Sequence, residues 1–331
     1  MAYSEIIRIF VPEIEKPGED MKKIFFELMQ IAVGQLDCLS RGPSPEEWQE
    51  LYTTAQRQEV AAVCYRSVVS LFEFGLRAPQ DISLDWMAEA EDLKERNRGL
   101  VKRLLALQQK LEERPVRSTI LLGAALARFY DKELQALRQS DATYIFVPGG
   151  NMQSVDLSDW EDMNISVINK VMVGRSYARS KRLEKWLLQY DEYLFRKVGD
   201  LTVPAYAMMV ALQFIHTYYQ FIHNHLVMRD LMDLFFVLRW SDDSTKKYRV
   251  EKTTVEGVLK SLGLSRFAGG VLWMVQEVFA LEHQNLPMEP LEQEGRFLLG
   301  EVMGDNHPIK RLWHLVKYYR WGDLNSLFLK K

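Results

Sequence analysis

An aspartate and a threonine two positions apart are the residues whose types and spacing come closest to a reactive site. Asp141 and Thr143 open a run of β-branched and aromatic residues, 143–147, that predicts a buried strand. Residues i and i+2 of a strand project from one face, so two carboxylates at this spacing could share divalent cations, which prefer anionic oxygen ligands. Thr143 supplies only a neutral hydroxyl. The pair is therefore too weakly charged to hold two divalent cations.

The elements that must position this pair form the one block of the sequence that predicts a sheet. A short aliphatic run, 117–122, is typical of a buried strand, and Gly123 then begins a tight turn into a helix that ends near residue 130. The strand at 143–147 stops at a turn signal, Pro-Gly-Gly-Asn, and a third strand is expected over 165–173.

Helical periodicity dominates on both sides of this block. The sequence Ser-Pro-Glu-Glu at 44–47 is a capping box with proline at the first helical position, and Ser83 can cap a long helix that follows. The predicted fold class is α+β and predominantly helical. A small mixed sheet in a core of residues 116–180 is flanked by an N-terminal helical region, 1–115, and a C-terminal helical region, 181–331.

The composition limits which cellular compartments and which binding partners are expected. The formal net charge of −3 gives the whole chain no electrostatic reason to bind nucleic acid. The two cysteines, Cys38 and Cys64, stand in apolar helical contexts and are expected to be packing residues in a reducing compartment. The apolar stretch around 205–215 is too short to span a bilayer, and no signal-peptide pattern opens the chain. We expect a cytoplasmic protein without a membrane span.

Several segments, in order, carry a likeness to one family. They are Ile-Leu-Leu-Gly-Ala-Ala-Leu at 120–126, Leu-Arg-Gln-Ser-Asp-Ala-Thr-Tyr at 137–144, Leu-Val-Met-Arg-Asp-Leu-Met-Asp-Leu at 226–234, and the runs 263–281 and 294–301. Together they resemble a bacterial family of nucleotidyltransferase-like proteins related to the polymerase-β superfamily, over most of the chain from about Pro45 to Glu301. In that family one strand ends in Leu-Lys-Gly, and a second carries Gly-Asp-Ile-Asp-Leu after an arginine. The resemblance implies a nucleotidyltransferase-like sheet.

The same resemblance implies a dismantled catalytic site. Nucleotidyl transfer is a displacement at phosphorus in which two metal ions, held by three carboxylates, clamp the attacking and leaving oxygens. Asp141 aligns with the first carboxylate, but Thr143 and Ser166 align with the other two. Ser140 replaces the glycine of the motif, and Leu122 replaces the phosphate-facing lysine. The chain therefore resembles a family member that keeps the fold and loses the chemistry.

We therefore expect an inactive nucleotidyltransferase-like protein that acts as a binding or regulatory module and has a protein or a nucleotide as partner. Asp141 is then a remnant of the catalytic set, with no metal and no cofactor bound. A nucleotide-sized cleft would be lined by Gly123, Ser140, Thr143, Arg229 and Asp233.

The alternative hypothesis is an active enzyme whose carboxylates come from elsewhere. An acidic segment follows the second strand and contains Asp156, Asp159, Glu161 and Asp162. If these joined Asp141, the site could hold Mg²⁺ and a nucleoside triphosphate and transfer a nucleoside monophosphate to an unknown acceptor. An acidic solvated loop is the favoured interpretation of that segment.

Two further groups have structural and functional interpretations. His216, His223 and His225 lie near Arg229 and Asp233, and a polar seam between packed helices is favoured over a ligand site. The segment 308–331 mixes basic and aromatic residues, which could suit nucleic acid or an anionic membrane. Its amphipathic face favours docking onto the body of the protein, and that face consists of Leu312, Leu315, Val316 and Tyr319.

Overall fold

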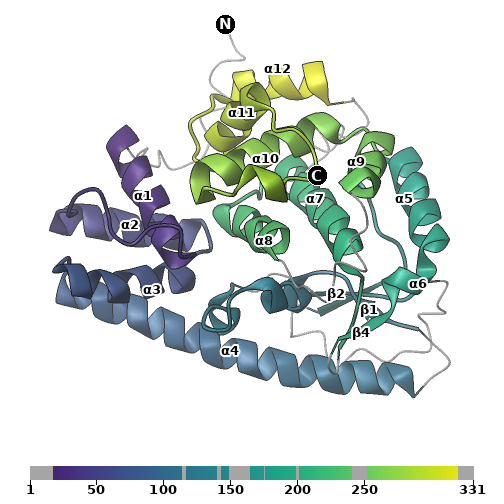
Figure 1. The fold of residues 1–331 in the computed structure, drawn as a ribbon, viewed down its shortest axis with the longest axis horizontal. Coiled ribbons are helices and arrows are strands. Elements are labelled where there is room, and N and C mark those ends of the chain that lie inside the picture. The colour runs from purple at the N-terminus through teal and green to yellow at the C-terminus, as the bar shows by residue number, and fades with distance from the viewer. Residues whose placement is uncertain are drawn as a thin grey trace, which may run out of the picture.

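Three helices pack at one end of the molecule and begin the fold. The computed structural model describes residues 18–113, 117–139, 143–148, 165–174, 176–198, 201–240 and 252–319. The three helices are α1 (Glu19–Ala32), α2 (Pro45–Arg57) and α3 (Ala61–Ser70), and they gather at the left of Figure 1. Phe25, Leu28 and Trp48 are buried in their shared core. The apolar spacing of these segments produces helices with one buried face.

The capping box predicted at the start of α2 is present. The Ser44 hydroxyl accepts a hydrogen bond from the backbone amide of Glu47 at 3.2 Å, and the Glu47 carboxylate accepts one from the backbone amide of Ser44 at 2.7 Å. Two backbone donors that the helix cannot satisfy are thereby paired.

Removal of this cap has a defined expected cost. Ser44→Ala should lower the free energy of unfolding by about 1 kcal/mol, because one amide of the first turn loses its acceptor. Guanidinium denaturation measures the change. The control is Thr53→Ala, since the exposed Thr53 hydroxyl bonds the backbone carbonyl and the side-chain amide of Gln49, one turn earlier in its own helix. Equal losses in the two variants would contradict the capping role.

A single long helix, α4 (Gln80–Glu112), runs along one side of the whole molecule (Figure 1). Its 33 residues span about 50 Å at the usual rise per residue. Near its start, the indole nitrogen of Trp86 donates to the Ala61 carbonyl at 2.6 Å. Near its end, the Gln108 side-chain amide exchanges two hydrogen bonds of 3.2 Å with the backbone of Thr202. The helix therefore connects the N-terminal helices to the strands.

The central sheet is mixed, as the sequence predicted. Strand β1 (Thr119–Ile120) pairs antiparallel with β2 (Thr143–Phe146), and β2 pairs parallel with β3 (Ile165–Ile168). A second sheet, which the sequence did not predict, is a hairpin of β4 (Arg196–Val198) and β5 (Leu201–Val203). With most described residues in helices, the chain is α+β and predominantly helical.

The C-terminal helices cover the other side of the sheet. They are α5 (Tyr177–Gln189), α6 (Asp191–Leu194), α7 (Tyr206–Ile222), α8 (Met228–Arg239), α9 (Lys252–Ser261), α10 (Ser265–Phe279), α11 (Glu292–Val302) and α12 (Pro308–Tyr318). Figure 1 shows the strands lying between α4 and this group. Helix α7 is buried along almost its whole length. Across the described ranges, no helix combines the length and the apolar character that crossing a membrane requires.

Helices α10 and α11 approach each other closely because two glycines lie at their contact. A Cβ atom on Gly295 would overlap the ring of Trp273, and one on Gly270 would come within 2.7 Å of the Glu294 Cγ atom. Because glycine has no side chain, the backbones of α10 and α11 can come into close contact at these positions. This contact places Glu294 at the interface between the helices, where it is completely buried.

Candidate functional site

The structure describes four of the six residues predicted to form the remnant site. Gly123, Thr143, Arg229 and Asp233 are described. Ser140 and Asp141 lie outside the described residues, and so do the four acidic residues of the alternative hypothesis, Asp156, Asp159, Glu161 and Asp162.

Gly123 and Thr143 meet at the turn that follows β1. Gly123 has a left-handed φ of +73° and begins the 3-10 helix η3 (Gly123–Phe129) where a helix was predicted. Thr143 is fully buried, and its hydroxyl accepts a hydrogen bond from the backbone amide of Ala124 at 3.3 Å. This hydroxyl ties the first turn of η3 to β2 and has a protein partner.

The strand register separates the two residues that aligned with the second and third carboxylates. Thr143 lies opposite Ile165, and Tyr144 lies opposite Ser166, in the parallel pair of β2 and β3. Since directly opposed residues share a face and successive residues alternate, Thr143 and Ser166 project from opposite faces of the sheet. The structure does not bring these two hydroxyls together.

Asp233 of α8 is held in a buried cluster with Arg138 and Tyr130. Nε and one Nη of Arg138 donate to the two carboxylate oxygens at 2.6 and 2.7 Å, and the Tyr130 hydroxyl donates to one of them at 2.7 Å. The side chains of Arg138 and Asp233 are each only 1% exposed. This is a bidentate guanidinium–carboxylate pair, and its two parallel hydrogen bonds fix the orientation of both side chains.

The surroundings of this cluster hold it in place. Asn97 of α4 donates to the backbone carbonyls of Ala136 and Arg138 at 2.8 and 2.9 Å, and the Tyr130 ring stacks on Phe236 at 4.0 Å. Burial, together with the negative charge of Asp233, raises the pKa of Tyr130 well above its usual value. The cluster therefore joins α4, the segment before β2, and α8.

Arg229 also lies in the interior with carboxylate partners. Its guanidinium is 3.0 Å from Glu59, which follows α2, and 3.0 Å from the buried Asp230. Its backbone amide donates to the Gln58 carbonyl at 3.2 Å. Arg229 thus joins the start of α8 to the N-terminal helices.

Of the three predicted histidines, His216 lies at a helix interface, whereas the contacts of His223 are with Tyr219 of the same helix, α7. His216 is buried, with its Nε2 atom 3.8 Å from a carboxylate oxygen of Asp230, so it lies at the contact of α7 and α8. His223 contacts the Tyr219 carbonyl at 2.8 Å and the Tyr219 ring at 4.0 Å. Within the described residues, no group of three His, Cys, Asp or Glu side chains is placed to hold a metal ion.

The last described helix, α12, is docked onto the body, as the sequence favoured. Leu315 and Tyr319 are buried, and Arg311 pairs with Glu301 and donates to the Phe221 carbonyl at 3.0 Å. Leu312, which was predicted for the docked face, is 39% exposed. The helix therefore packs through a narrower face than the sequence suggested, and residues 320–331 lie outside the described residues.

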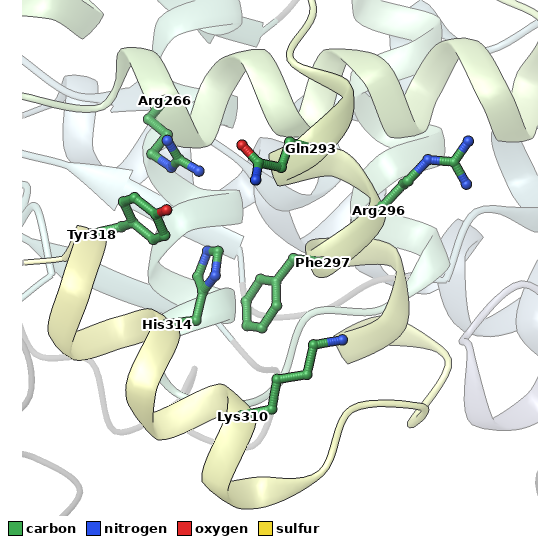
Figure 2. A pocket seen from close by; sticks show the side chains of 7 residues that line it. All are labelled: Arg266, Gln293, Arg296, Phe297, Lys310, His314 and Tyr318. Atoms are coloured by element: carbon green, nitrogen blue, oxygen red, sulfur yellow. The ribbon is translucent and has the colours of Figure 1, made fainter.

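A cavity of 260 Å³ between α10, α11 and α12 was not predicted from the sequence. We call it the α10–α12 pocket, and it is lined by Arg266, Gln293, Arg296, Phe297, Lys310, His314 and Tyr318 (Figure 2). Its residues come from three separate helices, so no local spacing marks them. The mixture of basic and aromatic residues after Pro308 was the one signal of this pocket in the sequence.

The buried carboxylate of Glu294 lies against this pocket and binds three of its neighbours. His314 contacts one oxygen at 2.8 Å, the Tyr319 hydroxyl donates to the same oxygen, and Arg266 donates to the other. Burial alone would raise the pKa of Glu294, but the hydrogen bonds from His314 and Tyr319 and the charge of Arg266 outweigh it and lower that pKa. Glu294 is therefore an anion that positions two of the pocket's side chains.

The chain thus has two regions of interest, which are the remnant site around Thr143 and the α10–α12 pocket. No family model, no curated protein and no solved structure matches the chain.

Proposed function

We propose that this chain is a nucleotidyltransferase-like protein that does not transfer nucleotides and acts as a binding or regulatory module. The observation that carries the proposal is the buried pairing of Asp233 with Arg138 and Tyr130. A carboxylate and a guanidinium that satisfy each other in the interior contribute no free charge to a reacting phosphate. Separating such a pair costs several kcal/mol, because each charge would be left buried alone.

The second support comes from the position that aligns with the second catalytic carboxylate. Thr143 carries no charge, and its hydroxyl already accepts a hydrogen bond from Ala124. Two divalent cations require several anionic ligands to offset their charge, and one neutral hydroxyl cannot replace a carboxylate. Under this proposal, any nucleotide that enters the remnant site is bound without being consumed.

Calorimetry and a transfer assay test the proposal together. The full chain is titrated with each nucleoside triphosphate, with and without Mg²⁺, and then incubated with the radiolabelled nucleotides and candidate acceptors. We expect covalent label at background level and any nucleotide binding to be independent of Mg²⁺. Binding without transfer supports the nucleotide as the ligand. If no nucleotide binds, the result indicates that the proposed module binds a protein instead.

A matched pair of variants defines the outcome that would overturn the proposal. Asp141→Ala removes the remaining catalytic carboxylate of the motif, whereas Asp131→Ala removes an aspartate that pairs with Arg239 on the surface. Mg²⁺-dependent binding that is lost only in Asp141→Ala would instead indicate an active enzyme. Covalent labelling of any acceptor by the wild-type chain would indicate the same.

A further inference from the structure

The α10–α12 pocket gathers positive charge from three helices. Arg266 comes from α10, Arg296 from α11 and Lys310 from α12. Figure 2 shows the side chains of Arg266, Gln293, Phe297, His314 and Tyr318 converging on one space, with Lys310 at its edge and the guanidinium of Arg296 turned away from it. Three cationic side chains around one small cavity make it attractive to an anion.

The carboxylates near the pocket do not offset all of this charge. Glu294 serves Arg266 and His314 together, and Glu292 pairs with Arg296 at 2.8 Å on the exposed face of α11. Lys310 has no ion pair among the residues that the structure describes. The pocket therefore has at least one positive charge in excess.

Several of the pocket's groups are fixed before any ligand binds. His314 stacks on the Phe297 ring at 3.5 Å, and the Arg266 guanidinium lies over the Tyr318 ring at 3.6 Å. The second Nη atom of Arg266 is buried and has no hydrogen-bond partner within the described part of the chain. A buried guanidinium donor without an acceptor is a costly arrangement that an anionic oxygen would relieve.

Size and chemistry narrow the class of ligand. The volume of 260 Å³ lies just below the roughly 300–1,000 Å³ typical of pockets for drug-sized molecules, which favours a small ligand. Arginine forks match the oxygens of phosphates and carboxylates, but several cations together suit a dianion better than a monoanion. The rings of Phe297 and Tyr318 offer contact to an apolar or planar group.

We propose that the α10–α12 pocket binds a small phosphate monoester. Its dianion is held by Lys310 and Arg266, and its organic part lies against the aromatic side chains. This pocket lies apart from the remnant site, and its occupation does not depend on the function proposed above.

Calorimetry of the full chain at low ionic strength tests this site with three probes, namely phenyl phosphate, inorganic phosphate and benzoate. We expect phenyl phosphate to bind most tightly, because it combines a dianion with a ring. Lys310→Ala should weaken it by about five- to tenfold, while Lys310→Arg retains most of the affinity. Thermal melting verifies that each variant is folded.

The matched control is Lys102→Ala, which removes an exposed lysine from α4. It changes the net charge as Lys310→Ala does, so it should alter the affinity for phenyl phosphate less than twofold. Equal weakening by the two variants, or no saturable binding of phenyl phosphate, would overturn the proposal. Benzoate binding as tightly as phenyl phosphate would contradict the preference for a dianion. Asp141→Ala should leave phenyl phosphate binding unchanged, which separates this site from the remnant site.

Discussion

Asp233→Ala is expected to lower the free energy of unfolding by about 3–5 kcal/mol, the largest effect of any single change considered for this protein. The substitution leaves the Arg138 guanidinium buried without the carboxylate that now binds it at 2.6 and 2.7 Å. It also removes the acceptor of the Tyr130 hydroxyl. An uncompensated buried charge accounts for most of the expected loss.

Guanidinium denaturation measures this loss, and two further variants define its origin. Asp131→Ala breaks the exposed ion pair with Arg239 and should cost less than about 1 kcal/mol. The double variant Arg138→Met with Asp233→Leu removes both charges and should recover most of the stability. If Asp233→Ala were as mild as Asp131→Ala, Asp233 would not be held in a buried pair. It would then be available to a ligand, as the sequence first suggested.

Glu294→Ala is expected to lower the free energy of unfolding by about 3 kcal/mol and to loosen α12. The carboxylate now binds Arg266 of α10 together with His314 of α12 and Tyr319, which follows that helix. Without it, three buried or half-buried donors lose a common acceptor. Hydrogen exchange of the α12 amides should speed up selectively, because His314 of this helix and Tyr319, which follows it, both bond Glu294.

The lowered pKa of Glu294 predicts how this contribution depends on pH. A carboxyl whose pKa is lower in the folded protein than in the unfolded chain stabilises the fold above its unfolded value of about 4.3. That stabilisation is lost as pH falls through the lower, folded pKa. The difference in stability between wild type and Glu294→Gln should therefore be largest near neutral pH and shrink on acidification. The control is Glu292→Gln, which alters an exposed pair with Arg296 and should cost less than about 1 kcal/mol.

Much of the fold could be predicted because its signals are local. The capping box at Ser44 and the runs that form β2 and β3 depend on residues within a few positions of each other. The hairpin of β4 and β5 was missed because strands of three residues show no periodicity, and contacts such as that of Gln108 with Thr202 hold it in place. Helix α4 begins at Gln80, three residues before the predicted cap Ser83, so that serine lies within its first turn.

The partners of the candidate site could not be predicted, because they come from distant parts of the chain. Asp233 and Arg229 were named from the sequence, but Arg138 is 95 residues from Asp233, and Glu59 is still farther from Arg229 along the chain. Charged residues on a helix indicate a polar contact without indicating which contact it is. The α10–α12 pocket escaped prediction for the same reason.

The long helix α4 limits how this protein can be divided. It is bonded through Trp86 to α3 and through Gln108 to β5, and its last turns bury Leu104, Leu107 and Leu111. A fragment that ended at residue 115 would therefore leave these three leucines exposed to solvent on the last turns of α4. Fragment studies of the N-terminal helices need either the strands that follow or polar substitutions at those three leucines.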